Sequence, residues 1–196
     1  MPVNRSIPDV AQKRKDWNGL ISGFKASDLV FLDESGCNTD MTRRYAYSLG
    51  GSRAVDSTPL SKPKNTTILS SIQLDGTLRY TTFSGGTTVE RFKRYLETDL
   101  LPHLNGNSVL IMDNMKSHHP KAVKNLLDSS EIRYIYLPPY SPDLNPIEKL
   151  WSKVKAFLRK FKARTLDALP NAIQNAFHSV TISDCSGWFR FCGHAL

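Results

Sequence analysis

The sequence predicts an α/β domain built on a mixed sheet, antiparallel in its first part and parallel in its second. Strand-like segments joined by hairpin turns come first, and strand and helix patterns alternate afterwards. In addition, the two apolar runs Leu29–Asp33 and Val109–Asp113 each end on an aspartate. Short apolar runs are typical of strands buried on both faces. A layered fold with its central strands in the core follows from these observations.

The first part of the chain combines a polar start with hairpin signals. Residues 1–28 are expected to be a tail or linker that ends in a short helix, because apolar side chains recur there at a loose helical spacing. Asp75-Gly76 is a strong signal for a hairpin turn between two strands. The strands expected in this part are Leu29–Asp33, Arg44–Leu49, Thr66–Leu74 and Leu78–Phe83.

Helices and strands alternate in the second part. Helical periodicity predicts helices at Thr87–Leu101, Pro120–Ser129, Pro146–Phe161 and Leu166–Val180. Strands are expected at Val109–Asp113 and Ile132–Leu137. Four prolines stiffen the segment between the last strand and the long helix at 146–161. Residues 181–196 are expected to form a C-terminal tail.

The charge balance points to a polyanionic partner. The 196 residues contain 26 Lys and Arg against 18 Asp and Glu, a formal net charge of +8. Such a balance indicates nucleic acid first and an anionic membrane surface second, and a basic protein without either partner is the plain alternative. No apolar run approaches the roughly 20 residues that span a bilayer. The three scattered cysteines fit a reducing cytoplasm.

Two aspartates are the first candidates for chemistry. Asp33 and Asp113 each stand at the end of an apolar strand, the edge where open α/β sheets bind ligands. If the two strands are neighbours, these ends lie about 4.8 Å apart. Carboxylates at that distance repel each other unless a cation lies between them. Mg²⁺ suits such a site because it prefers oxygen ligands and keeps several waters.

Glu148 is the candidate third ligand, with a competing interpretation. Asn145 resembles a helix N-cap and Pro146 a first helical residue, so Glu148 falls at the third position of a capping box. From the residues alone the cap is favoured, and the two roles are compatible. Glu34 follows Asp33 but is expected on the opposite face of the strand, so we leave it out of the site.

Taken together, these residues resemble the DDE transposases, specifically the mariner superfamily and its bacterial insertion-sequence branch. The motifs that carry the resemblance are Leu32–Gly36, Met112–Asn114 with His118 following, and the block Leu137–Glu148. Thirty-four residues separate Asp113 from Glu148, which is the spacing of that group. The resemblance covers about residues 17–180, and the proline-rich block is its most specific part.

The resemblance implies a ribonuclease-H-like three-layer fold, with a mixed five-stranded sheet flanked by helices and a catalytic domain at 29–180. It also implies cleavage of double-stranded DNA at transposon ends and strand transfer into a target, commonly at TA. Two Mg²⁺ or Mn²⁺ ions would be held there, one shared by Asp33 and Asp113 and one by Glu148. Asn114 and His118 are expected to contact the ligands or the DNA. A homodimer in the DNA complex is also implied.

Basic residues follow Glu148 along the long helix. Seven cations with one anion, beginning at a candidate nuclease site, favour a surface that follows DNA phosphates over an ordinary solvated face. The apolar stripe of the same helix is interpreted as core. The residues expected to bind DNA are Lys62, Lys64, Lys149, Lys153, Lys155, Arg159, Lys160 and Lys162.

One departure from the family leaves alternatives open. Full-length relatives carry an N-terminal helix-turn-helix region, whereas only about 30 residues precede Asp33 here. The sequence therefore predicts the catalytic part of a cytoplasmic, nucleoid-associated bacterial transposase, with residues 1–28 left after a missing recognition region that a separate gene or frame would encode. The rival hypotheses are an inactive DNA-binding or regulatory remnant and a host ribonuclease-H-like nuclease.

Overall fold

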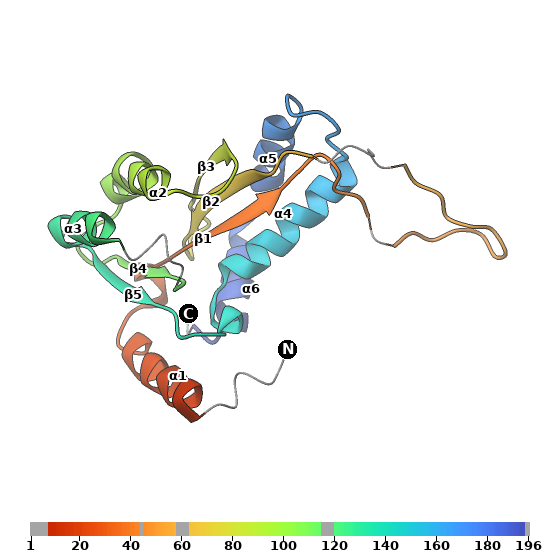
Figure 1. Cartoon of the computed structure of the whole chain (residues 1–196). Coiled ribbons are helices and arrows are strands. Elements are labelled where there is room, and N and C mark those ends of the chain that lie inside the picture. The colour runs from red at the N-terminus through yellow and green to blue at the C-terminus, as the bar shows by residue number, and fades with distance from the viewer. Residues whose placement is uncertain (1–7, 44, 58–62, 115–119, 195–196) are drawn as a thin grey trace.

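A single mixed sheet forms the centre of the part of the chain that the structure describes. The computed structural model describes residues 8–43, 45–57, 63–114 and 120–194. Neighbouring strands run in the order β3-β2-β1-β4-β5, in which β1, β2 and β3 pair antiparallel and β1, β4 and β5 pair parallel (Figure 1). The predicted mixed five-stranded sheet is confirmed. Its strands are β1 (Leu29–Cys37), β2 (Thr66–Ile72), β3 (Leu78–Ser84), β4 (Val109–Met112) and β5 (Arg133–Tyr136).

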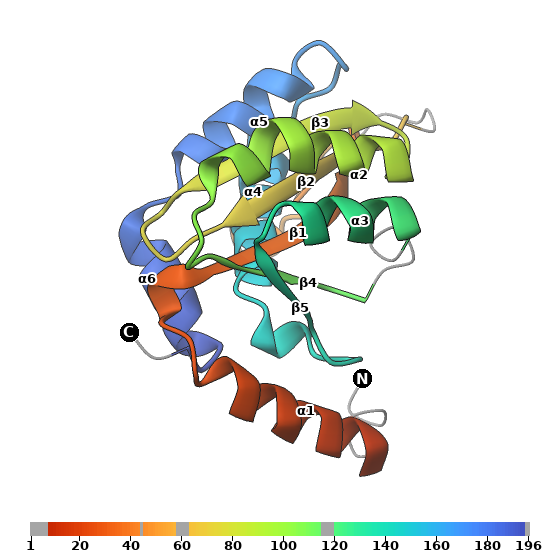
Figure 2. The same cartoon turned by 90° about the vertical axis from the view of Figure 1, so that its left-hand side faces the viewer.

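Helices cover both faces of this sheet. Helices α2 (Val89–Tyr95) and α3 (Lys121–Ser129) lie on one face, and α2 continues as a π-helical turn at Leu96–Leu100 (Figure 2). Helix α1 lies at the bottom of both views, below β5. The remaining long elements are α1 (Pro8–Ile21) and, on the other face, α4 (Ile147–Phe161), α5 (Leu169–His178) and α6 (Ile182–Phe191).

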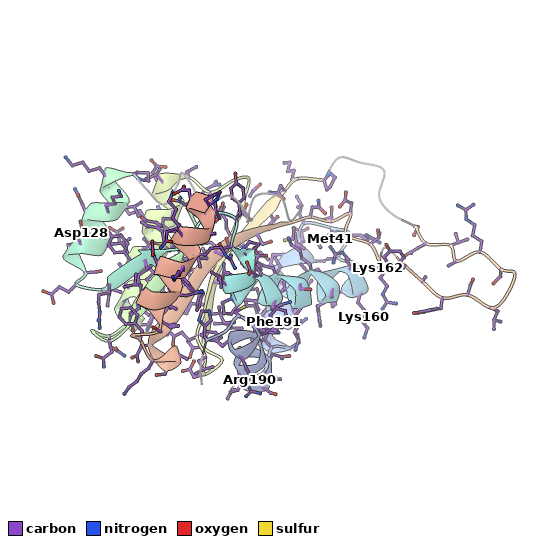
Figure 3. The ribbon with its side chains drawn as sticks, turned by 90° about the horizontal axis from the view of Figure 1, so that it is seen from below. Met41, Asp128, Lys160, Lys162, Arg190 and Phe191 are labelled. Carbon is purple, nitrogen blue, oxygen red and sulfur yellow. The ribbon has the colours of Figure 1, made fainter. Side chains whose placement is uncertain are left out.

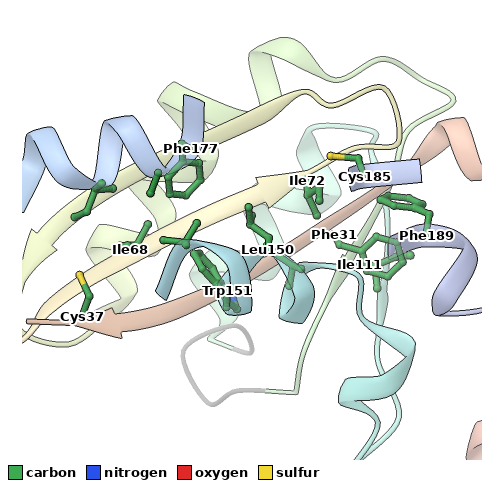
Figure 4. Close-up of a cluster of buried hydrophobic side chains, with 14 of the residues drawn as sticks. Phe31, Cys37, Ile68, Ile72, Ile111, Leu150, Trp151, Phe177, Cys185 and Phe189 are labelled. Atoms are coloured by element: carbon green, nitrogen blue, oxygen red, sulfur yellow. The ribbon is translucent and has the colours of Figure 1, made fainter. Parts of the chain in front are cut away.

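Alternation along the strands divides the core into two clusters. Phe31 and Ile111 pack on the face covered by α4 and α6, together with Trp151 and Phe189 (Figure 4). The residues next in sequence to Phe31 and Ile111 pack on the other face, with α2 and α3. Because successive side chains point to opposite faces, the position two residues after Phe31 or Ile111 returns to the α4 face. Asp33 and Asp113 occupy those positions.

The predicted strand at 44–49 is wrong. Residues 45–48 have no regular structure and belong to an arm that projects from the body (Figure 1). Tyr45 and Tyr47 are 90% and 105% exposed. Their alternation imitates a strand, but a strand also needs a neighbour to pair its backbone groups, and none of the described strands runs beside this segment. Arg164 holds both ends of the arm by donating to the carbonyl oxygens of Thr39 (3.2 Å), Met41 (3.1 Å) and Ser57 (3.1 Å).

The end predicted for the first strand is also wrong. β1 continues past Asp33 to Cys37, because β2 pairs with it as far as Cys37↔Thr66. On its other side the pairing with β4 stops at Leu32↔Met112. The site therefore lies where two strands separate, with one of them continuing in the sheet.

Both ends of the described chain pack against the body. The helix expected near the N-terminus is α1, and it buries Val10, Trp17 and Ile21. The predicted C-terminal tail contains α6, whose Phe189 is 0% exposed and meets Phe31 edge-on at 5.4 Å between ring centroids. A short apolar pattern at the end of a sequence does not reveal such packing, because its partner lies in β1.

None of the helices in the described ranges is long and apolar enough to cross a membrane.

The three cysteines are side chains of the core. Cys37, Cys185 and Cys192 are unpaired and buried, and burial raises the pKa of each thiol to about 11. The thiols therefore stay protonated at neutral pH and act as core side chains.

The packing of α6 predicts a large difference between two phenylalanines on one helix. Phe189→Ala should lower the free energy of unfolding by about 3–5 kcal/mol, because it leaves a cavity beside Phe31. Phe191→Ala is the matched control, since Phe191 is 67% exposed, and it should cost less than about 1 kcal/mol. Urea denaturation measures both. Equal, small effects would show that α6 does not belong to the folded body.

Candidate active site

The ladder between β1 and β4 places two carboxylates side by side. Its register runs from Leu29↔Val109 to Leu32↔Met112. The next residue on each strand is an aspartate, Asp33 on β1 and Asp113 immediately after β4. Since adjacent strands lie about 4.8 Å apart, the two residues are neighbours at the point where the strands separate. This is the arrangement that the two apolar runs predict.

Asp33 is a buried carboxylate with one strong partner. Its side chain is 8% exposed, and its Oδ2 accepts a hydrogen bond of 2.9 Å from the indole Nε1 of Trp151 on α4. Burial raises the pKa of Asp33 to about 7, against the lowering effect of hydrogen bonds from the Glu34 backbone and Trp151. The negative charges of Asp113 and Glu148 raise it further. Asp33 therefore ionises only near neutral pH without a cation.

Glu148 completes the cluster from the first turn of α4. It lines a pocket of about 280 Å³ with Asp113, Asn114 and the loop that precedes α4. Partial burial raises the pKa of Glu148, the charge of Lys155 lowers it, and the charge of Asp113 raises it. The structure thus brings Asp113 and Glu148 to one pocket and Asp33 within electrostatic reach of both.

The capping box predicted at Glu148 is not formed. In a capping box, the Glu148 carboxylate would accept a hydrogen bond from the backbone N–H of Asn145. Here that N–H donates to the carbonyl of Pro142 at 3.2 Å. The Oδ1 of Asn145 accepts from the N–H of Ile147 at 3.4 Å, one residue before the position that the box requires. A 3₁₀ turn at Pro142–Leu144 leads directly into the helix and takes over this role. The carboxylate of Glu148 is left to face the pocket.

Asn114, which the resemblance implies as a contact of the metal ligands or the DNA, lines the pocket. His118 and Lys62 lie outside the described residues. Glu34 is on the opposite face of β1, as its position in the alternation predicts, and its Oε2 has no hydrogen-bond partner among the described residues.

Sequence reasoning missed three residues near the site. Trp151 was assigned to the core stripe, and its indole N–H also reaches Asp33. Tyr140 also lines the pocket and is 58% exposed. Its backbone φ is 57°, a value that residues other than glycine rarely adopt. Arg14 contacts the loop before α4. A signal for Arg14 was present, because it recurs with Val10 and Trp17 on one face of a helix.

The donor set fits hard divalent cations. All three candidate ligands offer carboxylate oxygens, which suit Mg²⁺ or Mn²⁺. As the side chains lie, no three His, Cys, Asp or Glu residues in the described ranges form a cluster for a single ion. A two-ion site does not require one, since Mg²⁺ usually takes one or two carboxylates and completes its shell with water and phosphate oxygens. Burial is the main cause of the raised pKa of Asp33 and of Glu148, and the charge of Asp113 adds to both, a contribution that a bound cation would balance.

Comparison with known proteins identifies the class. Residues 28–170 match the model of the DDE superfamily endonucleases, and the chain belongs to this family. Within it, a 97-residue stretch covering 47% of the chain is 28% identical to the Transposable element Tc1 transposase of Caenorhabditis elegans, of which it covers 36%.

Solved structures agree on the fold. The Mos1 transposase in its paired-end complex with the left transposon end superposes with a TM-score of 0.81 at 17% identity, over 97% of this chain and 60% of that one. The catalytic domain of Mos1 mariner transposase gives 0.71 at 16% identity, over 94% and 89%. The ribonuclease-H-like fold and the resemblance to mariner-type transposases are confirmed, while the bacterial branch stays a prediction. The chain spans 36% of the Tc1 transposase and 60% of the Mos1 chain in that complex.

Asp33 should destabilise the metal-free protein as pH rises. Its pKa is about 7 in the folded state, against 3.8 for an unperturbed aspartate, so its favourable contribution is complete below about pH 4 and is lost as pH rises toward 7. Asp33→Asn keeps an acceptor for Trp151 and removes the charge. We expect its free energy of unfolding at pH 8 in EDTA to be about 1–3 kcal/mol higher than that of wild type, and we expect this difference to shrink toward pH 4.

Denaturant titrations at pH 4.5 and pH 8 measure this difference. The same variant should lose the rise in melting temperature that Mg²⁺ gives the wild-type chain. A stability difference that does not change with pH would contradict the assignment of Asp33 as a buried ionisable group.

Proposed function

We propose that the chain is the catalytic part of a DNA transposase, which cleaves DNA at transposon ends and transfers the freed strand into target DNA. The observation that carries the proposal is the gathering of Asp33, Asp113 and Glu148 at one end of the sheet in a DDE superfamily endonuclease domain. No described feature favours an inactive remnant, since all three candidate ligands are present, or a host nuclease, since the relatives above are transposases.

Asp33 and Asp113 are proposed to hold one divalent ion and Glu148 the second. When bound, such ions activate the attacking oxygen and stabilise the leaving oxygen in phosphodiester chemistry. In this chain, Trp151 fixes the orientation of the Asp33 carboxylate by donating to Oδ2. The Mos1 paired-end complex has been solved with Mn and with Mg, which supports either ion here.

The basic residues of α4 divide by face, which narrows the proposed DNA path. Lys149 lies over the ring of Phe191 at 3.8 Å, and Lys153 pairs with Asp184, so both engage α6. At the far end of the helix Lys162 pairs with Asp56 at 2.6 Å, close to exposed Lys160 (Figure 3). These contacts account for part of the charge that sequence analysis assigned to DNA.

A second face of α4 carries Glu148, Lys155 and Arg159. Lys155 is close enough to lower the pKa of Glu148. Lys155 and Arg159 also line a pocket with the end of β1 and the residues that follow it, Gly36 to Thr42. We propose that DNA phosphates approach the carboxylates along this face, with exposed Lys64 as a further contact.

The proposed partners follow from the same reasoning. They are double-stranded transposon-end DNA, a TA-containing target, a second copy of the chain in the DNA complex and a separate helix-turn-helix part. One of the similar Mos1 structures is a paired-end complex with the left transposon end, which supports the first of these.

Glu148→Gln tests the proposed function. Because no capping box involves Glu148, the variant should unfold within about 1 kcal/mol of wild type. It should lose Mg²⁺-dependent cleavage of DNA carrying the transposon end, since a neutral amide does not hold the ion. Glu97→Gln is the control, because Glu97 is an exposed glutamate that pairs with Lys93 four residues before it and lies outside the candidate site, and it should cleave normally. Normal cleavage by Glu148→Gln in purified protein would refute the metal-ligand role.

A charge comparison on one helix tests the proposed DNA path. Replacing Lys155 and Arg159 by Gln should weaken binding to duplexes of different sequence by a similar factor, and should reduce the salt dependence by about two charges. Replacing Lys149 and Lys153 by Gln changes net charge equally but removes contacts to α6. Fluorescence anisotropy at several salt concentrations measures both. A larger loss of affinity for the second pair would place the DNA on the α6 side.

A further inference from the structure

The loop between β5 and α4 forms one wall of the candidate active site. Its residues Leu137 to Pro142 line the same pocket as Asp113 and Glu148. The loop enters from β5, where the N–H of Leu137 donates to the carbonyl of Met112 at 2.8 Å, and leaves through the 3₁₀ turn Pro142–Leu144. The carbonyl of Asn145 then accepts the N–H of Glu148 at 3.2 Å. The position of Glu148 therefore depends on how this loop is held.

Arg14 on α1 grips the middle of the loop. Its Nη1 donates to Oγ of Ser141 at 2.6 Å and to Oδ1 of Asp143 at 3.1 Å, and its Nη2 donates to Oδ2 of Asp143 at 2.7 Å. A two-point contact between guanidinium and carboxylate fixes direction as well as distance. The Ser141 hydroxyl, which accepts from Arg14, also donates to the carbonyl of Pro139 at 3.1 Å. The contact with Arg14 is therefore linked to the prolines of the loop.

Arg14 lies on the packed face of its helix. It follows Val10 by four residues and precedes Trp17 by three, and both of these side chains are buried. The side chain of Arg14 is 21% exposed and that of Asp143 is 35% exposed. Partly burying a cation costs free energy unless it is paired with good geometry. Lys13, one residue earlier, is 52% exposed and pairs with Asp9 on its own helix.

A second contact fixes the loop just beyond the residues that Arg14 contacts. Nε2 of His194 donates to the carbonyl of Leu144 at 3.0 Å. The ring of His194 is buried, packs against Trp17 and Phe31, and burial lowers its pKa. Helix α1 and the end of the described chain thus both contact the same loop.

The conformation of the loop shows that it needs this support. Tyr140 has a φ of 57°, in the left-handed region, between Pro139 and Ser141. A side chain in that region carries strain, which persists only where surrounding contacts enforce it. The hydrogen bond from Arg14 constrains Ser141, the residue that follows Tyr140 in the chain.

We propose that Arg14 is a positioning residue for Glu148. By holding Ser141 and Asp143, it sets the place from which α4 starts and so the distance between the Glu148 carboxylate and Asp113. This inference rests on the proposed function, because it assigns Arg14 to the metal site of that function. It makes α1 part of the catalytic unit, although α1 contributes no candidate metal ligand.

A double-mutant cycle with a neighbouring control tests the proposal. The variants are Arg14→Ala, Asp143→Asn, their combination, and Arg14→Lys, with Lys13→Ala as the control on the same helix. Two readouts apply to the full chain: the Mg²⁺ concentration for half-maximal DNA cleavage, and Mg²⁺ binding followed by the side-chain carboxyl signal of Glu148 in NMR spectra.

Arg14→Ala should raise the Mg²⁺ requirement in both readouts by about tenfold or more, the usual scale for a residue that supports a metal ligand. The combined variant should lose no more than Arg14→Ala alone, because the contact with Asp143 is already absent in that variant. Arg14→Lys should restore part of the loss, since Lys keeps the charge but not the two-point geometry. Lys13→Ala should match wild type.

Two results would overturn the proposal, and they are distinguishable. If wild type binds Mg²⁺ and cleaves DNA while a folded Arg14→Ala protein shows the same Mg²⁺ dependence, then Arg14 does not position the site. If Arg14→Ala does not fold, Asp143→Asn supplies the same comparison. If the wild-type chain itself binds no divalent ion, the proposed function fails, and the inference fails with it.

Discussion

Burial of the Asp33 carboxylate beside two further acidic side chains, Asp113 and Glu148, is the constraint on which the rest of this structure depends. The backbone register of β1 and β4 makes Asp33 and Asp113 neighbours at the point where the strands separate. Burial holds the pKa of Asp33 near 7, so a site suited to cations is a source of instability without them. The apolar clusters on both faces of the sheet supply the stability that the site takes away.

The local part of this arrangement is predictable from sequence, and the non-local part is not. Asp33 and Asp113 follow apolar runs, so the runs, their ends at the sheet edge and the alternation of faces indicate the pair. Glu148 follows only from the resemblance, since its own surroundings imitate a helix cap. The true end of β1 depends on pairing with a later strand, β2, and the grip of Arg14 on Asp143 joins residues 129 apart. A pattern read within one segment contains neither of these.

Charge on a helix is a poor guide to what the helix binds. Sequence analysis assigned all the cations of α4 to DNA, yet Lys149 and Lys153 engage α6. Lys155 and Arg159 lie on the same helix face as Glu148, seven and eleven residues further on, and Lys155 lowers the pKa of Glu148. The helix thus combines three tasks on separate faces: core packing, attachment of α6 and the proposed approach of DNA.

The alternation of faces along β1 has a consequence for insertions and deletions. One residue gained or lost between Leu29 and Asp33 would reverse the faces of the side chains on one side of the change. The Asp33 carboxylate would then point toward α2 and α3, or the side chains before the change would point toward the wrong apolar cluster. The projecting arm has no such parity: its ends are tied by Arg164, and its middle, around Leu49, is exposed. Changes of chain length in β1 therefore remove the site and the core together, whereas changes of length in the middle of the arm leave both in place.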